Sequence, residues 1–202
     1  MLTEGSTMTE RVVLVTGTPC VGKTSVARLL TSKLDAFYIN LTQLAVNENL
    51  TWGQDEERKS IIVDESKMRR RIGEIIENCR KKDVIIDGHY AVNVVPKKYV
   101  TRVFVLRRDP IELRKFMKNS GFSGRKLWEN LASEILDVCL VEALNMQGED
   151  KVCELDTTDK SVGEVVDEIL GILDGREKCR VGCVDWLGML EKKGLLEDYL
   201  RI

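Results

Sequence analysis

The motif that most constrains this chain is Gly-Thr-Pro-Cys-Val-Gly-Lys-Thr at residues 17–24. It matches the pattern G-x-x-x-x-G-K-[ST], which cradles phosphate groups when it joins a buried strand to a helix. The apolar run at residues 12–16 predicts that strand, and residues 25–30 predict the first turns of an amphipathic helix. The sequence therefore favours a phosphate-binding loop over the alternative, a glycine-containing surface turn with a solvated lysine.

Each residue type in this loop has a distinct chemical use. Gly17 and Gly22 allow a tight turn, so that consecutive backbone N–H groups point at the β- and γ-phosphates. The helix that follows adds the partial positive charge of its N-terminus. Lys23 places a full charge on the terminal phosphates, and the Thr24 hydroxyl is suited to ligate Mg²⁺. We therefore expect a nucleoside triphosphate with Mg²⁺ at this loop.

Strand-like and helix-like segments alternate along the chain, which predicts an α/β fold with a parallel sheet and helices on both faces. Five segments are expected to form the strands: residues 12–16, 36–39, 84–87, 102–106 and 152–155. The helices expected after the loop helix are residues 41–50, 64–81, 111–118, 125–147 and 161–173. In the helix at 125–147, the side chains expected to face the core are Leu127, Leu131, Ile135, Val138 and Val141. Residues 51–60 are interpreted as a polar excursion. The expected fold is thus a P-loop NTPase with a five-stranded parallel sheet.

The charge balance and hydropathy of the chain limit its partners. Lys and Arg number 31 against 33 Asp and Glu, so the net charge of −2 gives no global positive field, and we expect no strong autonomous binding to nucleic acid. There is no run of 18 apolar residues, and the first ten residues lack the basic start and apolar middle of a signal peptide. We therefore expect a cytoplasmic protein with no membrane partner.

The six cysteines are scattered and form no C-x-x-C pair: Cys20, Cys79, Cys139, Cys153, Cys179 and Cys183. We interpret most of them as reduced, buried apolar side chains. The C-x-x-x-C spacing of Cys179 and Cys183 leaves two alternatives open. A zinc site is disfavoured because the one histidine lies far upstream, and a disulfide is favoured only if the organism is a hyperthermophile.

A candidate metal-orienting carboxylate, Asp87, ends the apolar run at residues 84–86. It should emerge at the carboxyl edge of the sheet, where ligands bind in open α/β folds. The alternative is a turn aspartate beside Gly88. His89, the only histidine, follows two residues later, and on composition alone it is more typical of a solvated surface group.

Several further motifs match one family in combination. They are Gly-Thr-Pro-x-Val-Gly-Lys-Thr, Tyr38-Ile-Asn40, Asp87-x-His89, Gly121-Phe122, Lys126-Leu-x-Glu-Asn130, Glu134-Ile135 and Asp156-Thr-Thr158. Together they resemble the adenylate kinase isoenzyme six family over residues 11–173. The resemblance implies a broad-specificity nucleoside monophosphate kinase with ATPase activity, ATP as donor and AMP or another nucleoside monophosphate as acceptor. It also implies a role in late maturation of the 30S ribosomal subunit, through a small-subunit ribosomal protein on the pre-30S particle.

The same resemblance implies roles for individual positions. The family's ATP contacts, most of them made by backbone N–H groups, correspond to Cys20, Gly22, Lys23, Thr24 and Ser25. Asp87 and His89 correspond to the family's Asp-x-His pair and are candidate catalytic residues together with Lys23; Asp87 and Thr24 are the candidate metal ligands. The adenylate-kinase-like fold has a short monophosphate-binding segment at residues 40–64 and a short lid at residues 119–128.

The lid departs from the family pattern. Members often carry arginines at two positions where this chain has Phe116 and Ser120. A lid arginine that neutralises transition-state charge is worth on the order of 10³-fold or more in rate. Ser120 is kept as a nucleotide-contacting position. Arg125 is our first choice for the substitute cation, with Arg114 and Lys126 as alternatives.

The chain is expected to divide into a disordered leader at residues 1–10, a kinase domain at 11–173 and a helical C-terminal extension at 174–202. We expect the extension to pack on the kinase domain. The alternative is a partner-binding arm that exposes Trp186.

Three function classes stay open at this point. They are a nucleoside monophosphate kinase, an ATP-driven ribosome assembly factor with weak kinase activity, and a kinase of another small metabolite. A GTPase is disfavoured because the chain contains no Asn-Lys-x-Asp motif.

Overall fold

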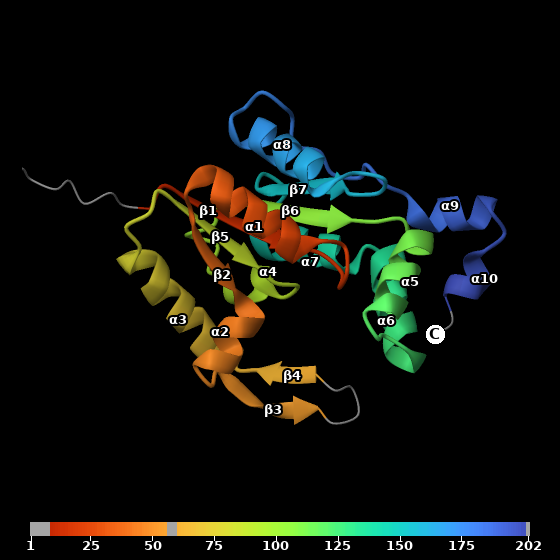
Figure 1. Cartoon of the computed structure of the whole chain (residues 1–202), viewed down its shortest axis with the longest axis horizontal. Helices are drawn as coiled ribbons and strands as arrows, with labels where there is room; N and C mark the ends of the chain where they lie inside the picture. The colour runs from red at the N-terminus through yellow and green to blue at the C-terminus, as the bar shows by residue number, and fades with distance from the viewer. Residues whose placement is uncertain (1–8, 56–59, 201–202) are drawn as a thin grey trace, which may run out of the picture.

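The sheet has the predicted parallel architecture. A computed structural model describes residues 9–55 and 60–200 of the protein. Five parallel strands form one sheet in the order β2-β5-β1-β6-β7 (Figure 1). Their bounds are β1 Arg11–Thr16, β2 Phe37–Asn40, β5 Asp83–Asp87, β6 Arg102–Arg107 and β7 Val152–Asp156. The prediction of five parallel strands is confirmed, and the carboxyl ends of all five meet at one edge of the sheet.

Helices cover both faces of the sheet because alternate side chains of β1 enter two separate cores. Val13 and Val15 belong to one core, whereas Val12 and Leu14 belong to the other. The first core is completed by α1 (Lys23–Leu34), α5 (Pro110–Asn119), α6 (Gly124–Ile135) and α8 (Val162–Leu173). The second core is completed by α2 (Leu41–Asn47), α3 (Glu65–Asn78), α4 (Ala91–Val94) and α7 (Val138–Gln147).

The segment predicted as a polar excursion contains a small hairpin. β3 (Thr51–Asp55) pairs with β4 (Ser60–Val63) in an antiparallel two-stranded sheet that lies apart from the main sheet (Figure 1). Trp52 on this hairpin is 72% exposed, and the Lys67 ammonium lies 5.1 Å from the centre of its ring. The prediction missed the strands because polar residues and a glycine interrupt any alternating pattern.

The long helix predicted at residues 125–147 is wrong in one respect: it is broken into α6 and α7. The Glu134 carbonyl, which would accept a hydrogen bond from residue 138 in a continuous helix, instead accepts one from the Arg107 guanidinium at 2.8 Å. Asp137 turns into the left-handed region with a φ of 57° and also pairs with Arg107. The break shifts the phase of the apolar stripe. Val138 and Val141 are therefore exposed, contrary to expectation, and the buried residues of α7 are Leu140, Ala143 and Gln147.

The C-terminal segment packs on the rest of the protein through α9 (Trp186–Lys192) and α10 (Leu196–Tyr199), which contact α6. Trp186, Leu190 and Tyr199 are buried, so Trp186 forms no exposed patch. Just before α9, the Glu154 N–H of β7 donates to the Arg180 carbonyl at 2.8 Å. The extension therefore runs along the outer edge of β7.

One disulfide fastens this extension, between Cys153 of β7 and Cys179. The other four cysteines are free, as expected for most of the six, but none of these four is buried: Cys20, Cys79 and Cys139 are half-buried and Cys183 is exposed. The alternative of a disulfide between Cys179 and Cys183 is wrong, because Cys179 pairs with Cys153, which lies 26 residues away in sequence and shows no recognisable spacing. In the part of the chain that the structure describes, no group of His, Cys, Asp and Glu side chains is arranged to hold a metal by itself.

Two expectations concern the ends and the membrane. Residues 1–8 of the expected leader lie outside the described residues. The last two residues of the expected leader are hydrogen-bonded to the segment before β5. The Thr9 hydroxyl donates to the Lys81 carbonyl, and the Glu10 N–H donates to the Lys82 carbonyl. Across residues 9–55 and 60–200, no helix has the length and apolar character needed to cross a bilayer.

Candidate nucleotide-binding site

The phosphate loop connects β1 to α1 with the backbone geometry that the motif requires. Gly17 and Gly22 have φ angles of 132° and 104°, and a Cβ on Gly17 would lie 2.4 Å from the Leu106 carbonyl oxygen. Only glycine fits at position 17 for both reasons. The N-terminus of α1 has no side-chain cap and no acidic residue in its first turn. Its N–H groups therefore suit a bound phosphate, which carries the charge and acceptor oxygens that a cap would supply.

Lys23 lies across this loop. Its Nζ donates a hydrogen bond to the Thr18 carbonyl at 2.9 Å. Burial lowers the pKa of the Lys23 ammonium, and the negative charge of Asp87 opposes that effect. A polyphosphate would supply further negative charge at the same place, so the lysine and the loop fit the triphosphate predicted from the sequence.

Asp87 is held at the carboxyl end of β5 by three donors from two elements, α1 and β2. Its Oδ2 accepts hydrogen bonds from the Thr24 hydroxyl at 2.7 Å, the Tyr38 hydroxyl at 3.0 Å and the Asn40 amide at 2.9 Å. The strand register explains this arrangement because Asn40 of β2 lies directly opposite Asp87. The Thr24 hydroxyl and the Asp87 carboxylate together supply the hard oxygen atoms that Mg²⁺ prefers. They are therefore the residues that would hold a Mg²⁺ ion.

Tyr38 and Asn40 belong to one of the family motifs, and Asn40 begins the predicted monophosphate-binding segment, but the sequence analysis assigned neither residue a contact with Asp87. Asn40 accepts a hydrogen bond from the Gln43 N–H through its Oδ1, and thus caps α2 while its amide binds Asp87. Burial raises the pKa of the Tyr38 phenol, which keeps this side chain protonated and able to donate. The available signal was their place at the end of β2, because parallel strand ends meet at one edge. These two residues join the metal-orienting carboxylate to the predicted monophosphate-binding segment.

His89 lies just beyond Asp87 and is exposed to solvent, although protein atoms crowd its ring. Desolvation of the ring by these protein atoms is the largest cause that lowers the pKa of His89, to about 4. The positive charges of Lys23 and Lys126 also lower this pKa, and the negative charge of Asp87 opposes the shift. Water that reaches the ring counters part of the effect. The Thr16 hydroxyl donates to the His89 carbonyl at 3.1 Å, which ties this loop to β1. The lowered pKa therefore favours the neutral imidazole at pH 7.

The lid contributes Lys126 to this neighbourhood. Its charge acts on His89, and its Nζ lies 5.6 Å from the centre of the Phe122 ring. Arg125 is mostly exposed and pairs with Glu129 at 2.7 Å, one turn along the same helix. Ser120 ends α5, where its N–H donates to carbonyls of that helix. The contacts of Arg125 and Ser120 are thus with residues of α6 and α5, the helices that carry them, and their roles at the nucleotide stay predictions.

Arg114, the other alternative lid cation, is used in packing. Its guanidinium lies between two aromatic rings, 4.8 Å from the centre of Trp128 and 5.1 Å from that of Tyr199. Such stacking favours a fixed position for the guanidinium. Arg114 of α5 therefore contacts both Trp128 of α6 and Tyr199 of the C-terminal extension.

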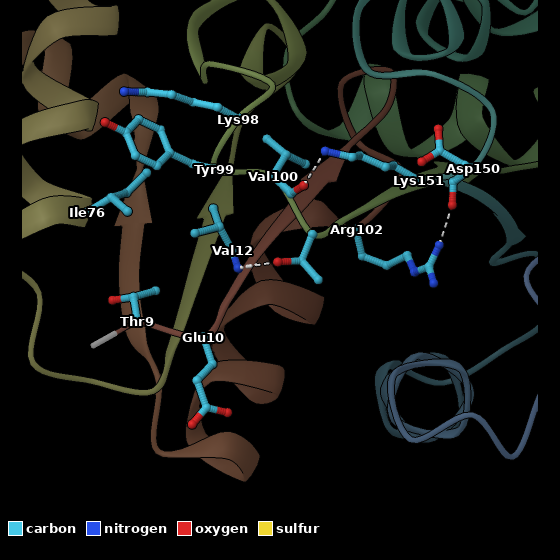
Figure 2. A pocket seen from close by; sticks show the side chains of 11 residues that line it. Thr9, Glu10, Val12, Ile76, Lys98, Tyr99, Val100, Arg102, Asp150 and Lys151 are labelled. Carbon is cyan, nitrogen blue, oxygen red and sulfur yellow. Dashed lines mark hydrogen bonds between the residues drawn. The ribbon is translucent and has the colours of Figure 1, made fainter. Parts of the chain in front are cut away.

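A cavity of about 530 Å³ lies away from the phosphate loop, at the opposite edge of the sheet and at the amino ends of β1, β6 and β7 (Figure 2). Two of its lining cations are engaged by backbone carbonyls: Lys151 donates to Val100 at 2.7 Å and Arg102 to Asp150 at 2.5 Å. The third, Lys98, lies 4.5 Å from the centre of the Tyr99 ring. Ligands of open α/β folds bind at the carboxyl ends of strands. The site at the phosphate loop is therefore the candidate nucleotide site.

Comparisons with known proteins agree with the fold and the loop. A family model described as "AAA domain" matches residues 13–137. A relative from Pyrococcus furiosus named "Putative adenylate kinase" is 37% identical over 192 residues, covering 95% of this chain and 98% of its own. A protein of the same name from Methanocaldococcus jannaschii is 34% identical over 174 residues, covering 86% of this chain and 92% of its own.

Solved structures resemble the protein in fold. A gluconokinase from Sinorhizobium meliloti superimposes with a TM-score of 0.53 at 16% identity, over 84% of this chain and 94% of its own. A thymidylate kinase from Candida albicans gives a TM-score of 0.54 at 15% identity, over 83% of this chain and 92% of its own. The parallel sheet and the loop after β1 thus define a P-loop protein with the fold of the small kinases. Within that class, the chain belongs to the family of the archaeal proteins named "Putative adenylate kinase".

Proposed function

We propose that the protein is a nucleoside monophosphate kinase that transfers the γ-phosphoryl group of ATP to AMP or another nucleoside monophosphate. The observation that carries the proposal is the position of Asp87. Its carboxylate bonds to Thr24 of the phosphate loop and to Asn40 at the start of the segment predicted to bind the monophosphate. Donor and acceptor sites therefore share one carboxylate. The names of the archaeal relatives support the same activity.

Each residue of the site has a role in this reaction. The loop N–H groups and Lys23 bind the β- and γ-phosphates and balance the charge that the transferring group spreads over its oxygens. Thr24 and Asp87 are the residues that would hold Mg²⁺, which would supply positive charge to neutralise the charge that develops on the phosphates. Asn40 and Tyr38 orient Asp87 by donating to its Oδ2. Lys126, whose charge acts on His89, is the lid cation that we propose for the phosphates.

The acceptor assay tests this proposal directly. ADP formation from ATP and Mg²⁺ should depend on AMP, and CMP, GMP and UMP rank the acceptors. Lys23→Ala is expected to abolish both this transfer and ATP hydrolysis, because the loop loses its cation. Lys33→Ala is the matched control, since Lys33 is exposed in the last turn of the same helix. Near-normal turnover in Lys23→Ala would contradict the assignment of the site.

A second proposed function is ATP hydrolysis coupled to release from a pre-30S particle. The lid favours it: Phe116 and Ser120 are exposed and uncharged, and the Arg108 guanidinium lies 4.8 Å from the centre of the Phe116 ring. A lid with less positive charge at the phosphates would slow transfer to a monophosphate. In this case the protein binds a basic small-subunit ribosomal protein, and binds naked rRNA far more weakly at physiological salt.

Calorimetric titration with a recombinant small-subunit ribosomal protein tests this second function. The affinity should fall as salt rises, and it should differ between the ADP-bound, ATP-analogue-bound and nucleotide-free states, because only a difference in affinity couples the two events. Equal affinities in all three states would leave a metabolic kinase as the better description.

A further inference from the structure

Glu134 lies in the last turn of α6 and is almost completely buried, with 1% of its surface exposed. Its Oε2 accepts a hydrogen bond from the Thr18 hydroxyl at 2.5 Å. Its Oε1 accepts three more, from the Arg107 guanidinium at 2.9 Å, the Arg108 backbone N–H at 3.1 Å and the Trp186 indole N–H at 3.1 Å. One carboxylate therefore joins four parts of the chain: the phosphate loop, the end of β6, the lid helix and the C-terminal extension.

The balance of charge makes the neutral donors important. Arg107 is the guanidinium partner of three carboxylates, Glu134, Glu154 and Asp137. Because this cation is shared, the buried Glu134 carboxylate depends on three further donors for the rest of its hydrogen bonds: the Thr18 hydroxyl, the Arg108 backbone N–H and the Trp186 indole. Removing the Thr18 hydroxyl takes away the donor to Oε2 and leaves an acceptor of a buried charge unsatisfied, which is costlier than the loss of an exposed hydrogen bond. Removing the Trp186 indole takes away one of the three donors to Oε1.

Thr18 links this cluster to the phosphate site. Its hydroxyl is held by Glu134, while its carbonyl accepts the hydrogen bond from Lys23 Nζ at 2.9 Å. Thr18 itself is buried. The conformation of the loop around Thr18 therefore depends on a carboxylate that α6 carries, and α6 begins within the lid.

We propose that Glu134 is a positioning residue that fastens the phosphate loop to the lid helix and the C-terminal extension. Through this link, the affinity of the loop for ATP depends on contacts made by Trp186 at the far side of the cluster. The proposal rests on the proposed function to the extent that the loop binds ATP. It adds that the C-terminal extension is part of the apparatus that preorganises the loop.

The test compares ATP affinities of two variants that each remove one donor with little change in shape. Thr18→Val should weaken ATP binding on the order of 10-fold, because the loop loses a hydrogen bond to a charged group and with it the preformed conformation. Thr18→Ser, which retains the hydroxyl, should restore most of the affinity. Trp186→Phe should weaken binding in the same direction, by roughly 3-fold, although it lies outside the loop. Dissociation constants are measured by isothermal calorimetry.

Two further measurements separate positioning from a purely structural role. Thr31→Val is the matched control, because the Thr31 hydroxyl donates to the Ala27 carbonyl within α1 and does not enter the cluster. In the double variant Thr18→Val with Trp186→Phe, the two effects on the ATP dissociation constant should be non-additive, since both donors serve one carboxylate.

Unchanged ATP affinity in Thr18→Val and Trp186→Phe, with only lowered melting temperatures, would refute the positioning role alone. Additive effects would refute the link through Glu134. Failure of the wild-type protein to bind ATP would refute the proposed function itself, and the positioning role with it.

Discussion

Replacing Leu190 with alanine should destabilise the whole protein, because Leu190 packs α9 into the core that also contains Val13 and Val15 of β1. Its side chain is completely buried in a cluster with residues of α1, α6 and α8. Deleting a fully buried leucine side chain costs about 2.7–5 kcal/mol, since the lost transfer energy adds to the cost of the cavity. For a chain of this size each kcal/mol lowers the melting temperature by about 2–4 °C, so the expected fall is about 5–20 °C.

The matched control lies on the same helix. Leu187 is 41% exposed, and Leu187→Ala should change the stability by no more than about 0.5 kcal/mol. Urea unfolding followed by circular dichroism gives both midpoints, and the melting temperature gives an independent measure. An unchanged slope with urea would show that the variants alter stability rather than the surface exposed on unfolding.

The result that refutes this reasoning is a Leu190→Ala protein with the wild-type midpoint. It would mean that α9 is detached in solution and contributes no packing to the unfolding unit. The extension would then be better described as an arm available to a partner, the alternative that the sequence left open.

Three further predictions concern the site. Asp87→Asn should lower Mg²⁺-dependent ADP formation on the order of 100-fold and change ATP affinity little, because the amide keeps the shape but loses the charge at the metal; collapse of affinity with an intact rate would contradict this role. His89 is the only histidine, so one NMR titration reports its pKa, expected about 4. Because this folded-state pKa lies below the ordinary value of 6.5, the stability from neutral His89 is complete above pH 6.5 and is lost as the pH falls toward 4; a midpoint near 6.5 would refute the shift. Lys126→Ala should raise the pKa of His89 and slow ADP formation more than Arg125→Ala does, whereas Ser120→Arg should speed it; equal rates in all three variants would place the lid charge elsewhere.

Local patterns predicted most of the fold. The strand before the loop, the loop itself and Asp87 at the end of β5 are encoded in short stretches of sequence, where apolar runs end in glycine or a carboxylate. The helix expected at residues 111–118 is found as α5. Pro110 is its first residue, where a missing N–H costs no hydrogen bond, and Asp109 caps the helix by accepting from the Ile111 N–H at 2.7 Å. Such features depend on neighbours a few residues away, so the sequence alone is sufficient to find them.

The features that were missed depend on residues far apart in the chain. The break between α6 and α7 arises from Arg107, which lies 27 residues before Glu134 in sequence. Its guanidinium donates a hydrogen bond to the Glu134 carbonyl, which would otherwise accept one within a continuous helix. The sequence analysis continued the helical periodicity of α6 past this break, and it therefore placed Val138 in the core although Val138 is exposed. Asn40 and Asp87 meet only because β2 and β5 are neighbours in the sheet. No periodicity within either segment contains that information.

The path of the C-terminal extension along β7 has a consequence for association between chains. A parallel sheet ends in two strands whose outer N–H and C=O groups can add a strand from another molecule. β2 at one edge is only four residues long, which gives a poor template. At the other edge, the Glu154 N–H of β7 donates a hydrogen bond to the Arg180 carbonyl. The disulfide between Cys153 and Cys179 keeps the segment around Arg180 in place. The extension thus acts as a guard against strand addition and aggregation. In a reducing environment that guard would depend on the packing of Trp186, Leu190 and Tyr199 and on the hydrogen bonds that Glu154 makes with Arg180 and Cys183.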